Sequence, residues 1–229
     1  MQKEYVRSLF DNIAYRYDLL NHLLSGGIDL YWRRKAIQTL VHHKPKRILD
    51  VATGTADFAL AAMKLRPERV IGVDISEPML EIGRKKVAQR NLTEKIRLAA
   101  GEAENLMFGA NSFDAALVAF GARNFEHLDK GLSEIYRVIS TGGKIVVLEF
   151  SKPKTFPFKQ LYFFYFKNIL PFVGRIISKN KEAYRYLPET VMNFPDGEDF
   201  LARLRRVGFS SLMEQQLTFG IATIYTGVK

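Results

Sequence analysis

Two aspartates, 24 positions apart, accompany short apolar runs in the first third of the chain. Asp50 stands in residues 47–58, where an apolar run passes through small residues around Gly54 and opens into a helical pattern, and Asp74 lies near the end of the run 70–75. A strand that leads into a helix through a tight loop brings backbone N–H groups close to a ligand. A carboxylate at the tip of the next strand can accept hydrogen bonds from both hydroxyls of a ribose. These stretches predict a nucleoside-binding site.

The loop after Asp50 favours a nucleoside without phosphates. It reads Gly54, Ala56 and Ala59 where a dinucleotide-binding loop carries three glycines, so a pyrophosphate fits poorly. S-adenosylmethionine is the common nucleoside ligand of this kind. Thr55 would lie with Gly54 against its methionine part, although Thr55 could also cap the helix that follows.

The apolar periodicity of the chain predicts the elements that must position this site. Strands are expected from residue 47 and at 70–75, 95–100, 113–120, 144–150, 211–218 and 221–228. Helices are expected at 4–24, 29–41, from 58 onward, 76–89, 128–139 and 196–207. Because a helix follows each early strand, the sheet should be parallel and doubly wound, with ligands at the carboxyl ends of its strands. The predicted fold class is α/β, with a mostly parallel seven-stranded Rossmann-like sheet that ends in an antiparallel hairpin around Gly220.

A single domain of residues 1–229 is expected, because no repeat, low-complexity segment or linker interrupts the chain. Residues 1–44 form a helical N-terminal part in which Tyr17 and Asn21 lie one turn apart. We interpret this part as a lid over the ligand pocket, with a packing helix that has a polar rim as the alternative. Residues 151–195 break the strand–helix alternation and form an aromatic and basic insertion.

Composition narrows the chemistry and the partners. There is no cysteine, which excludes disulfides, cysteine nucleophiles and thiolate metal sites, and four histidines form no spaced ligand cluster, so no metal is expected. The first residues lack a secretory apolar region, which predicts a cytoplasmic protein. The net charge of +10 indicates an acidic partner, either nucleic acid, an anionic membrane surface or an anionic substrate. Residues 150–186 concentrate this charge, with eight lysines and arginines and the single acid Glu182.

Several stretches resemble known sequences. The loop 50–57, Asp74, the segment 101–104 and the closing hairpin resemble the class I S-adenosylmethionine-dependent methyltransferases. Over nearly the whole chain, the sequence is similar to the ubiquinone/menaquinone biosynthesis C-methyltransferase family, and residues 25–29 and 50–55 are more like its menaquinone members. The stretches that carry this second resemblance are 10–21, 120–124, 148–153 and 184–187.

The resemblance implies a binding site for S-adenosylmethionine as methyl donor. Asp74 would take the ribose hydroxyls, and Glu102 and Ala103 would meet the adenine edge. Ala56 stands where many members carry glycine, which would tighten the loop, and Ala119 stands where some carry serine, so a hydroxyl contact is lost. The implied donor residues are Asp50, Gly54, Thr55, Asp74, Glu102, Ala103 and Ala119.

The resemblance also implies the acceptor, which is a ring carbon of a prenylated demethylmenaquinol. Such a site must stabilise a developing phenolate. Arg123, beyond the fourth strand, has an always-charged fork for an oxyanion, and Asn124 and Tyr17 could donate further hydrogen bonds. An ion pair from Arg123 to the lid, for example to Asp18, is the alternative. No histidine is well placed as a general base. The proton acceptor is therefore not assigned to a residue, and water is the remaining candidate.

The insertion suits a substrate with an apolar tail. Its stretch 156–173 carries Lys159, Gln160, Lys167 and Asn168, so it is not a spanning helix. Residues 152–173 would instead form a groove for the tail or rest on anionic lipid at the inner face of the membrane. The alternative is a lid helix whose aromatic residues face the core or the partner of a homodimer.

Other classes of protein remain open at this stage. An RNA methyltransferase would suit the charge, but the fourth strand ends in residues 120–123, Phe-Gly-Ala-Arg, and not in the Asn/Asp-Pro-Pro-Tyr of enzymes that methylate amino groups of bases. We therefore expect no nucleic acid partner. An enzyme shared by the ubiquinone and menaquinone pathways, another small-molecule methyltransferase and a non-catalytic nucleoside-binding protein are the further alternatives.

Overall fold

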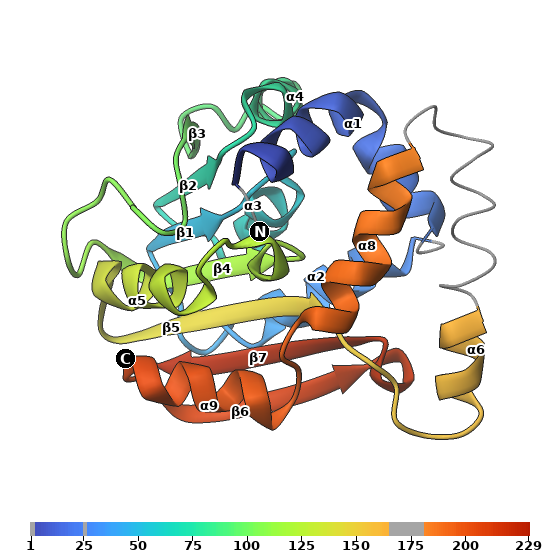
Figure 1. Ribbon diagram of the computed structural model, residues 1–229. Coiled ribbons are helices and arrows are strands. Elements are labelled where there is room, and N and C mark those ends of the chain that lie inside the picture. Colours follow the sequence, from blue (N-terminus) through green and yellow to red (C-terminus); the bar gives the residue numbers. More distant parts are fainter. Residues whose placement is uncertain (1–2, 25–26, 165–180) are drawn as a thin grey trace.

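The computed structural model describes residues 3–24, 27–164 and 181–229, without the side chains of 16–24, 181–185 and 187. Its centre is a seven-stranded sheet in the order β3-β2-β1-β4-β5-β7-β6 (Figure 1). The strands are β1 (Arg47–Val51), β2 (Arg69–Asp74), β3 (Ile96–Ala100), β4 (Phe113–Ala119), β5 (Ile139–Phe150), β6 (Ser210–Leu217) and β7 (Ala222–Val228). The helices are α1 (Lys3–Leu24), α2 (Ile28–Gln38), α3 (Asp57–Ala62), α4 (Glu77–Gln89), α5 (Leu128–Val138), α6 (Phe158–Phe164), α8 (Lys181–Asn193) and α9 (Glu198–Val207).

The direction of the strands confirms the predicted fold class. Strands β1 to β5 pair in parallel, whereas β7 is antiparallel to both β5 and β6. The hairpin between β6 and β7 turns through the short 3₁₀ segment Thr218–Gly220. It places β7, the last strand in sequence, between β5 and the edge strand β6.

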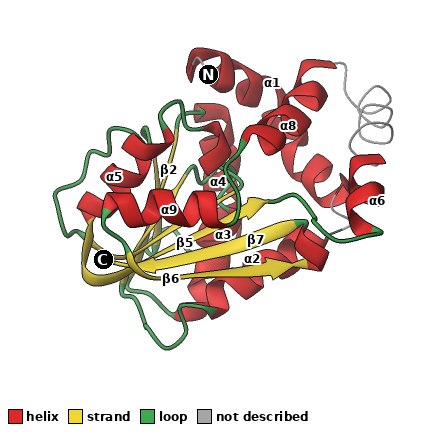
Figure 2. Cartoon of the chain, turned by 60° about the horizontal axis from the view of Figure 1, so that its bottom comes forward, coloured by secondary structure: helices red, strands yellow, loops and turns green. Residues whose placement is uncertain are grey.

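Helices cover both faces of the sheet, as Figure 2 shows. Ile48 and Leu117 face a core shared with α2, α3 and α4, whereas their neighbours Leu49 and Ala116 face a second core shared with α5 and α9. This division follows from the strand period of two, which sends successive side chains to opposite faces. Burial on both faces explains why these strands read as continuous apolar runs.

Local signals account for some element ends and not for others. The helix after β2 is capped by Ser76, whose hydroxyl accepts a hydrogen bond from the Met79 N–H at 3.4 Å. The predicted start of the fifth strand at residue 144 is wrong. Strand β5 already pairs through Ile139 with Phe113, and its register then shifts so that Lys144 pairs with Ala115. Gly142 and Gly143, which precede the predicted strand, therefore lie within an irregularity of a longer strand.

Two helices stand over the carboxyl ends of the parallel strands. Helix α1 contacts α2, α4 and α8, and Val6 and Leu9 of α1 form a small separate core with Tyr186 of α8 (Figure 1). In the insertion 151–195, α6 and α8 are described and residues 165–180 lie outside the described part. None of the described helices is both long and apolar enough to cross a membrane. The division into one domain with a lid and an insertion stays a prediction.

Candidate active site

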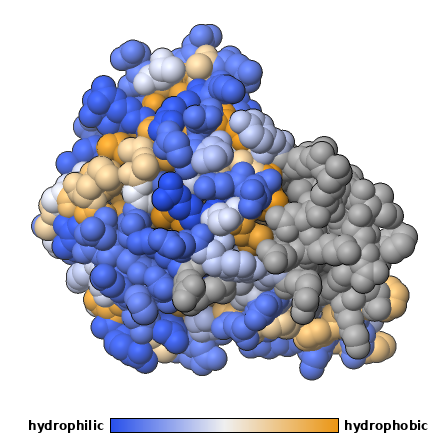
Figure 3. Space-filling view, turned by 45° about the horizontal axis from the view of Figure 1, so that its top comes forward, coloured by the Kyte–Doolittle hydropathy of each residue, from blue (hydrophilic) through white to orange (hydrophobic). Residues whose placement is uncertain are grey.

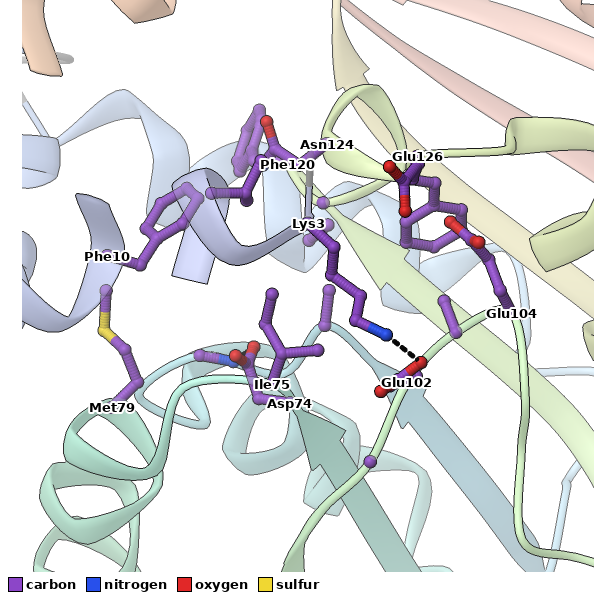
Figure 4. Close-up of a pocket in the computed structure, with 18 residues that line it drawn as sticks. Lys3, Phe10, Asp74, Ile75, Met79, Glu102, Glu104, Phe120, Asn124 and Glu126 are labelled. Carbon is purple, nitrogen blue, oxygen red and sulfur yellow. Dashed lines mark hydrogen bonds and ion pairs between the residues drawn. The ribbon is translucent and has the colours of Figure 1, made fainter. Parts of the chain in front are cut away.

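A cavity of about 730 Å³, including its open mouth, lies between α1 and the carboxyl ends of the strands. This is the edge of the sheet where doubly wound proteins bind ligands. Hydrophilic side chains dominate the α1 side of the molecule, and hydrophobic surface shows between them (Figure 3). The lining residues are Lys3, Val6, Phe10, Ala52, Gly54, Asp74, Ile75, Met79, Gly101, Glu102, Ala103, Glu104, Ala119, Phe120, Gly121, Asn124, Phe125 and Glu126 (Figure 4).

The carboxylate of Asp74 joins the loops after β1 and β2. Its two oxygens accept hydrogen bonds from the Gly54 N–H at 2.8 Å and from the Ser76 N–H at 2.9 Å. The Ser76 hydroxyl lies 2.6 Å from a carboxylate oxygen of Asp11 and donates to it, which attaches α1 to the same junction. Burial raises the pKa of Asp74, although the two backbone N–H donors lower it.

Glu102 and Ala103 lie on the segment after β3, beside the Asp74 wall. Lys3 of α1 reaches across the cavity, and its Nζ lies 2.5 Å from a carboxylate oxygen of Glu102 (Figure 4). Glu104 and Glu126 add further carboxylates along the same rim. Within the described residues, Glu104, Glu126 and His127 bring three candidate metal-ligand atoms within 4.8 Å of one another, a grouping that sequence spacing did not reveal.

Two residues that were predicted to bind the methyl donor, Asp50 and Thr55, lie beneath the loop after β1 and not on the cavity wall. Asp50 is 1 % exposed and accepts a hydrogen bond from the Thr53 hydroxyl at 2.6 Å, and its other oxygen has no hydrogen-bond partner in the described part of the chain. Burial raises the pKa of Asp50 to about 7. Thr55 is buried and its hydroxyl accepts a hydrogen bond from Lys86 at 3.1 Å. Thr55 does not cap α3, because the residue before that helix is Ala56.

Arg123 and Asn124 follow β4 in a short 3₁₀ turn, yet their side chains point to different places. The Arg123 side chain is only 5 % exposed, and its Nη1 donates to Glu149 at 2.9 and 3.0 Å and to the Phe120 carbonyl at 2.6 Å. Arg123 therefore has an ion-pair partner in the sheet. Asn124 lines the cavity, and its Oδ1 accepts a hydrogen bond from the Tyr186 hydroxyl at 2.8 Å. The side chains of Tyr17 and Asp18 lie outside the described part.

Apolar residues of the wall were not among the predicted site residues. Phe10 from α1, Ile75 and Met79 after β2, and Phe120 and Phe125 after β4 form this surface. The stretch 10–21 was noted as a family motif, and Phe120 opens another, so both carried a signal in the sequence. Ile75 directly follows the strand-end aspartate, whereas for Met79 and Phe125 only the fold shows the contact.

The fold defines the class of protein first. A SAM-dependent methyltransferase of Thermotoga maritima, described as a possible histamine N-methyltransferase, superposes with a TM-score of 0.68 at 21 % identity, over 97 % of this chain and 99 % of that one. At this identity the likeness shows the fold alone. The architecture is that of the class I S-adenosylmethionine-dependent methyltransferases, as predicted.

The family follows from the sequence comparisons. The model of the ubiE/COQ5 methyltransferase family matches residues 1–229, and the chain belongs to this family. A demethylmenaquinone methyltransferase of Bacteroides fragilis is 53 % identical over all of this chain and 94 % of its own length. A ubiquinone/menaquinone biosynthesis C-methyltransferase of Geotalea daltonii is 45 % identical over 99 % of this chain and 97 % of its own length. The predicted family is confirmed, and the protein is a methyltransferase that depends on S-adenosylmethionine.

The raised pKa of Asp50 predicts a pH-dependent stability of the ligand-free protein. The folded protein holds this proton up to about pH 7, whereas the unfolded chain releases it near pH 4, so the free energy of unfolding falls as the pH rises between these values. Asp50→Asn removes that dependence. The variant should gain on the order of 2–3 kcal/mol over the wild type between pH 5 and pH 8, measured by urea denaturation.

Asp114→Asn is the matched control for this measurement. Hydrogen bonds from Arg47 and Lys46 outweigh the effect of burial and lower the pKa of Asp114, so its titration lies below this range of pH. Its stability curve should run parallel to that of the wild type from pH 5 to pH 8. A parallel curve for Asp50→Asn as well would show that Asp50 is ionised in the folded protein at pH 5.

Proposed function

We propose that this chain transfers the methyl group of S-adenosylmethionine to a ring carbon of a prenylated demethylmenaquinol, which gives menaquinol. The observation that carries the choice of acceptor is the 53 % identity, over the whole chain, to a protein named demethylmenaquinone methyltransferase. The cavity supports the proposal because Asp74 on one wall and Asn124 on the other face a single space (Figure 4).

S-adenosylmethionine, the methyl donor, suits the side of the cavity that carries Asp74. A carboxylate offers about four acceptor positions, and Asp74 uses two of them for Gly54 and Ser76, which leaves capacity for the ribose hydroxyls. Ile75 and Met79 offer apolar surface for the adenine ring. At Gly54, a Cβ would meet nothing within 4 Å, so this side of the loop is open to the methionine part of the donor. When bound, S-adenosylmethionine supplies an electrophilic methyl group on a positively charged sulfur.

The other predicted donor residues take two kinds of role in this proposal. Glu102 and Ala103 meet the adenine edge from the segment after β3, and Ala119 lies at the end of β4 on the same wall. Asp50 and Thr55 act from below, where their hydrogen bonds hold the loop in shape. Because residue 119 is an alanine, no large side chain at this position separates the part of the cavity proposed for S-adenosylmethionine from the part proposed for the quinol.

The acceptor chemistry needs a polar contact on an otherwise apolar wall. The ring carbon is nucleophilic once the quinol has lost an O–H proton to solvent, and the C–C bond then forms as the S–C bond of the donor breaks. The Asn124 amide can donate to the ring oxygen whose negative charge drives this attack. Arg123 supports the turn that carries Asn124, and Tyr17 of α1 is the third polar residue. Water then accepts the ring proton, which restores the aromatic ring.

The function is tested by methyl transfer from labelled S-adenosylmethionine to reduced demethylmenaquinol in detergent. Reduced demethoxy-benzoquinol and total RNA serve as competing acceptors in parallel reactions. We expect label on the naphthoquinol. Label on both quinols would make the enzyme shared between two pathways, a second candidate that the Geotalea daltonii relative favours. Label on RNA alone would contradict the proposal.

Asp74→Ala should abolish donor binding. Hydrogen bonds to a charged group contribute about 1.5–3 kcal/mol each, so the loss of two ribose contacts should weaken the binding of S-adenosylhomocysteine by 100-fold or more. Isothermal titration calorimetry measures this affinity. Asp11→Ala is the control, because it removes the Ser76 contact of α1 and leaves the ribose acceptor in place. Near-normal affinity in Asp74→Ala would refute the ribose assignment.

We also propose that the enzyme works at the cytoplasmic face of the membrane, where a polyprenyl tail lies. Four apolar side chains on and next to α6 and in the turn before β7, three of them aromatic, are each 58–80 % exposed and make up what we call the aromatic surface: Phe156, Leu161, Phe164 and Phe219. Exposed apolar surface of this kind marks interaction sites. Lys154 and Lys159 lie beside it in sequence and are exposed, which suits anionic headgroups. A homodimer that covers this surface is the alternative.

The aromatic surface predicts binding to anionic vesicles. Phe156→Ser/Leu161→Ser/Phe164→Ser should lower the vesicle-bound fraction at least tenfold, because each apolar side chain that leaves the bilayer costs about 1.5–3 kcal/mol. Co-sedimentation with phosphatidylglycerol vesicles measures it. Met107→Ser/Met213→Ser removes two exposed apolar side chains elsewhere and should bind like the wild type. Equal binding by both variants would contradict membrane contact through α6.

A further inference from the structure

The turn after β4 is held by a buried ion pair. Arg123 donates both to the Phe120 carbonyl, within the turn, and to Glu149, whose side chain is fully buried in β5. Breaking a buried pair of this kind is strongly unfavourable, because it leaves a charge without compensation. The backbone at Asn124 is therefore fixed, and what remains free to vary is the rotation of the Asn124 side chain at the cavity wall.

A second contact reaches the Asn124 side chain from another part of the chain. Tyr186 of α8 stands 62 residues later in sequence, and its hydroxyl donates to Asn124 Oδ1 at 2.8 Å. Its ring lies in the small core below α1, with centroids 6.2 Å from Tyr5 and 6.3 Å from Phe10. The ring is thus held between two helices, and the direction of its hydroxyl is set by that packing.

The two ends of the Asn124 amide are chemically different. The oxygen only accepts hydrogen bonds and the nitrogen only donates them. Tyr186 donates to the oxygen, so the amide nitrogen, on the other branch of the amide, is the group that can donate to a ligand in the cavity. Burial raises the pKa of Tyr186 to about 12, so its hydroxyl keeps the proton that it donates. A quinol oxyanion in the cavity requires a hydrogen-bond donor on the wall, such as the amide nitrogen.

We infer that Tyr186 is a positioning residue for methyl transfer, which orients the Asn124 amide so that an N–H points at the oxygen of the acceptor ring. This inference rests on the proposed function and adds a residue for which the sequence indicated no role. Tyr186 also connects α8 to α1, so the amide is oriented only when both helices stand over the cavity. The packing of Tyr186 between α1 and α8 therefore also sets the direction of the hydrogen-bond donor at the acceptor end of the cavity.

The test compares Tyr186→Phe, Asn124→Ala and the double variant in methyl transfer to reduced demethylmenaquinol. Loss of one oriented hydrogen bond should lower kcat about tenfold in Tyr186→Phe. Asn124→Ala should be lowered at least as much, and the double variant should be no slower than Asn124→Ala. The affinity for S-adenosylhomocysteine should stay at the wild-type value in all three variants. Tyr5→Phe, which removes a hydroxyl from the neighbouring ring, should keep wild-type kcat.

A second readout needs no quinol. The side-chain amide signals of Asn124 in a ¹⁵N–¹H spectrum, identified by their absence in Asn124→Ala, should move in Tyr186→Phe and stay in place in Tyr5→Phe. Wild-type kcat in Tyr186→Phe, additive effects in the double variant or unmoved amide signals would each overturn the inference. A wild-type protein that binds the donor and methylates no quinol would refute the proposed function instead, and the amide signals would still decide the role of Tyr186.

Discussion

The Asp74 carboxylate is the contact on which the arrangement of the cavity depends. It accepts N–H groups from the loops after β1 and β2, and through Ser76 it reaches Asp11 of α1. Removing a charged group from water is costly, and hydrogen bonds to its oxygens offset that cost. Two strand ends and the covering helix therefore share one anchor, and this wall of the cavity is shaped before any ligand arrives.

Beneath the cavity, the end of β4 is held by charges and aromatic rings together. The rings of Phe120 and Phe150 pack in a tilted arrangement with centroids 4.6 Å apart, with the Arg33 guanidinium 5.2 Å from the first ring and Arg123 5.4 Å from the second. Phe120 has a positive φ of 57°, a conformation that non-glycine residues adopt at an energetic cost. The surrounding ring and guanidinium contacts stabilise it, and a rigid strand end gives Asn124 a defined position on the wall.

The cover of the cavity is held differently from its floor. The two main cores bury the sheet under helices on both faces, whereas α1 and α8 meet over a small core of Val6, Leu9 and Tyr186. The ion pair from Lys3 to Glu102 is well exposed and contributes little to stability. Elements with few buried apolar contacts open at lower cost than the main core. The floor of the cavity thus rests on the two large cores, whereas its cover packs on a small one.

Most strands and helices could be predicted from the sequence, although the fifth strand begins earlier than expected, whereas the partners of buried polar side chains could not. The positions of the strands follow from spacing within a few residues, and Asp74 was expected at the carboxyl edge of a parallel sheet, where it lies. From the sequence alone, Arg123 was expected to hold an oxyanion, with an ion pair to the lid, for example to Asp18, as the alternative, and no role was expected for Tyr186. The fold pairs Arg123 with a residue 26 positions away and joins Tyr186 to Asn124 across 62 positions. Periodicity and capping are local properties of the chain, whereas the partner of a buried polar group is decided by which elements the sheet topology brings side by side.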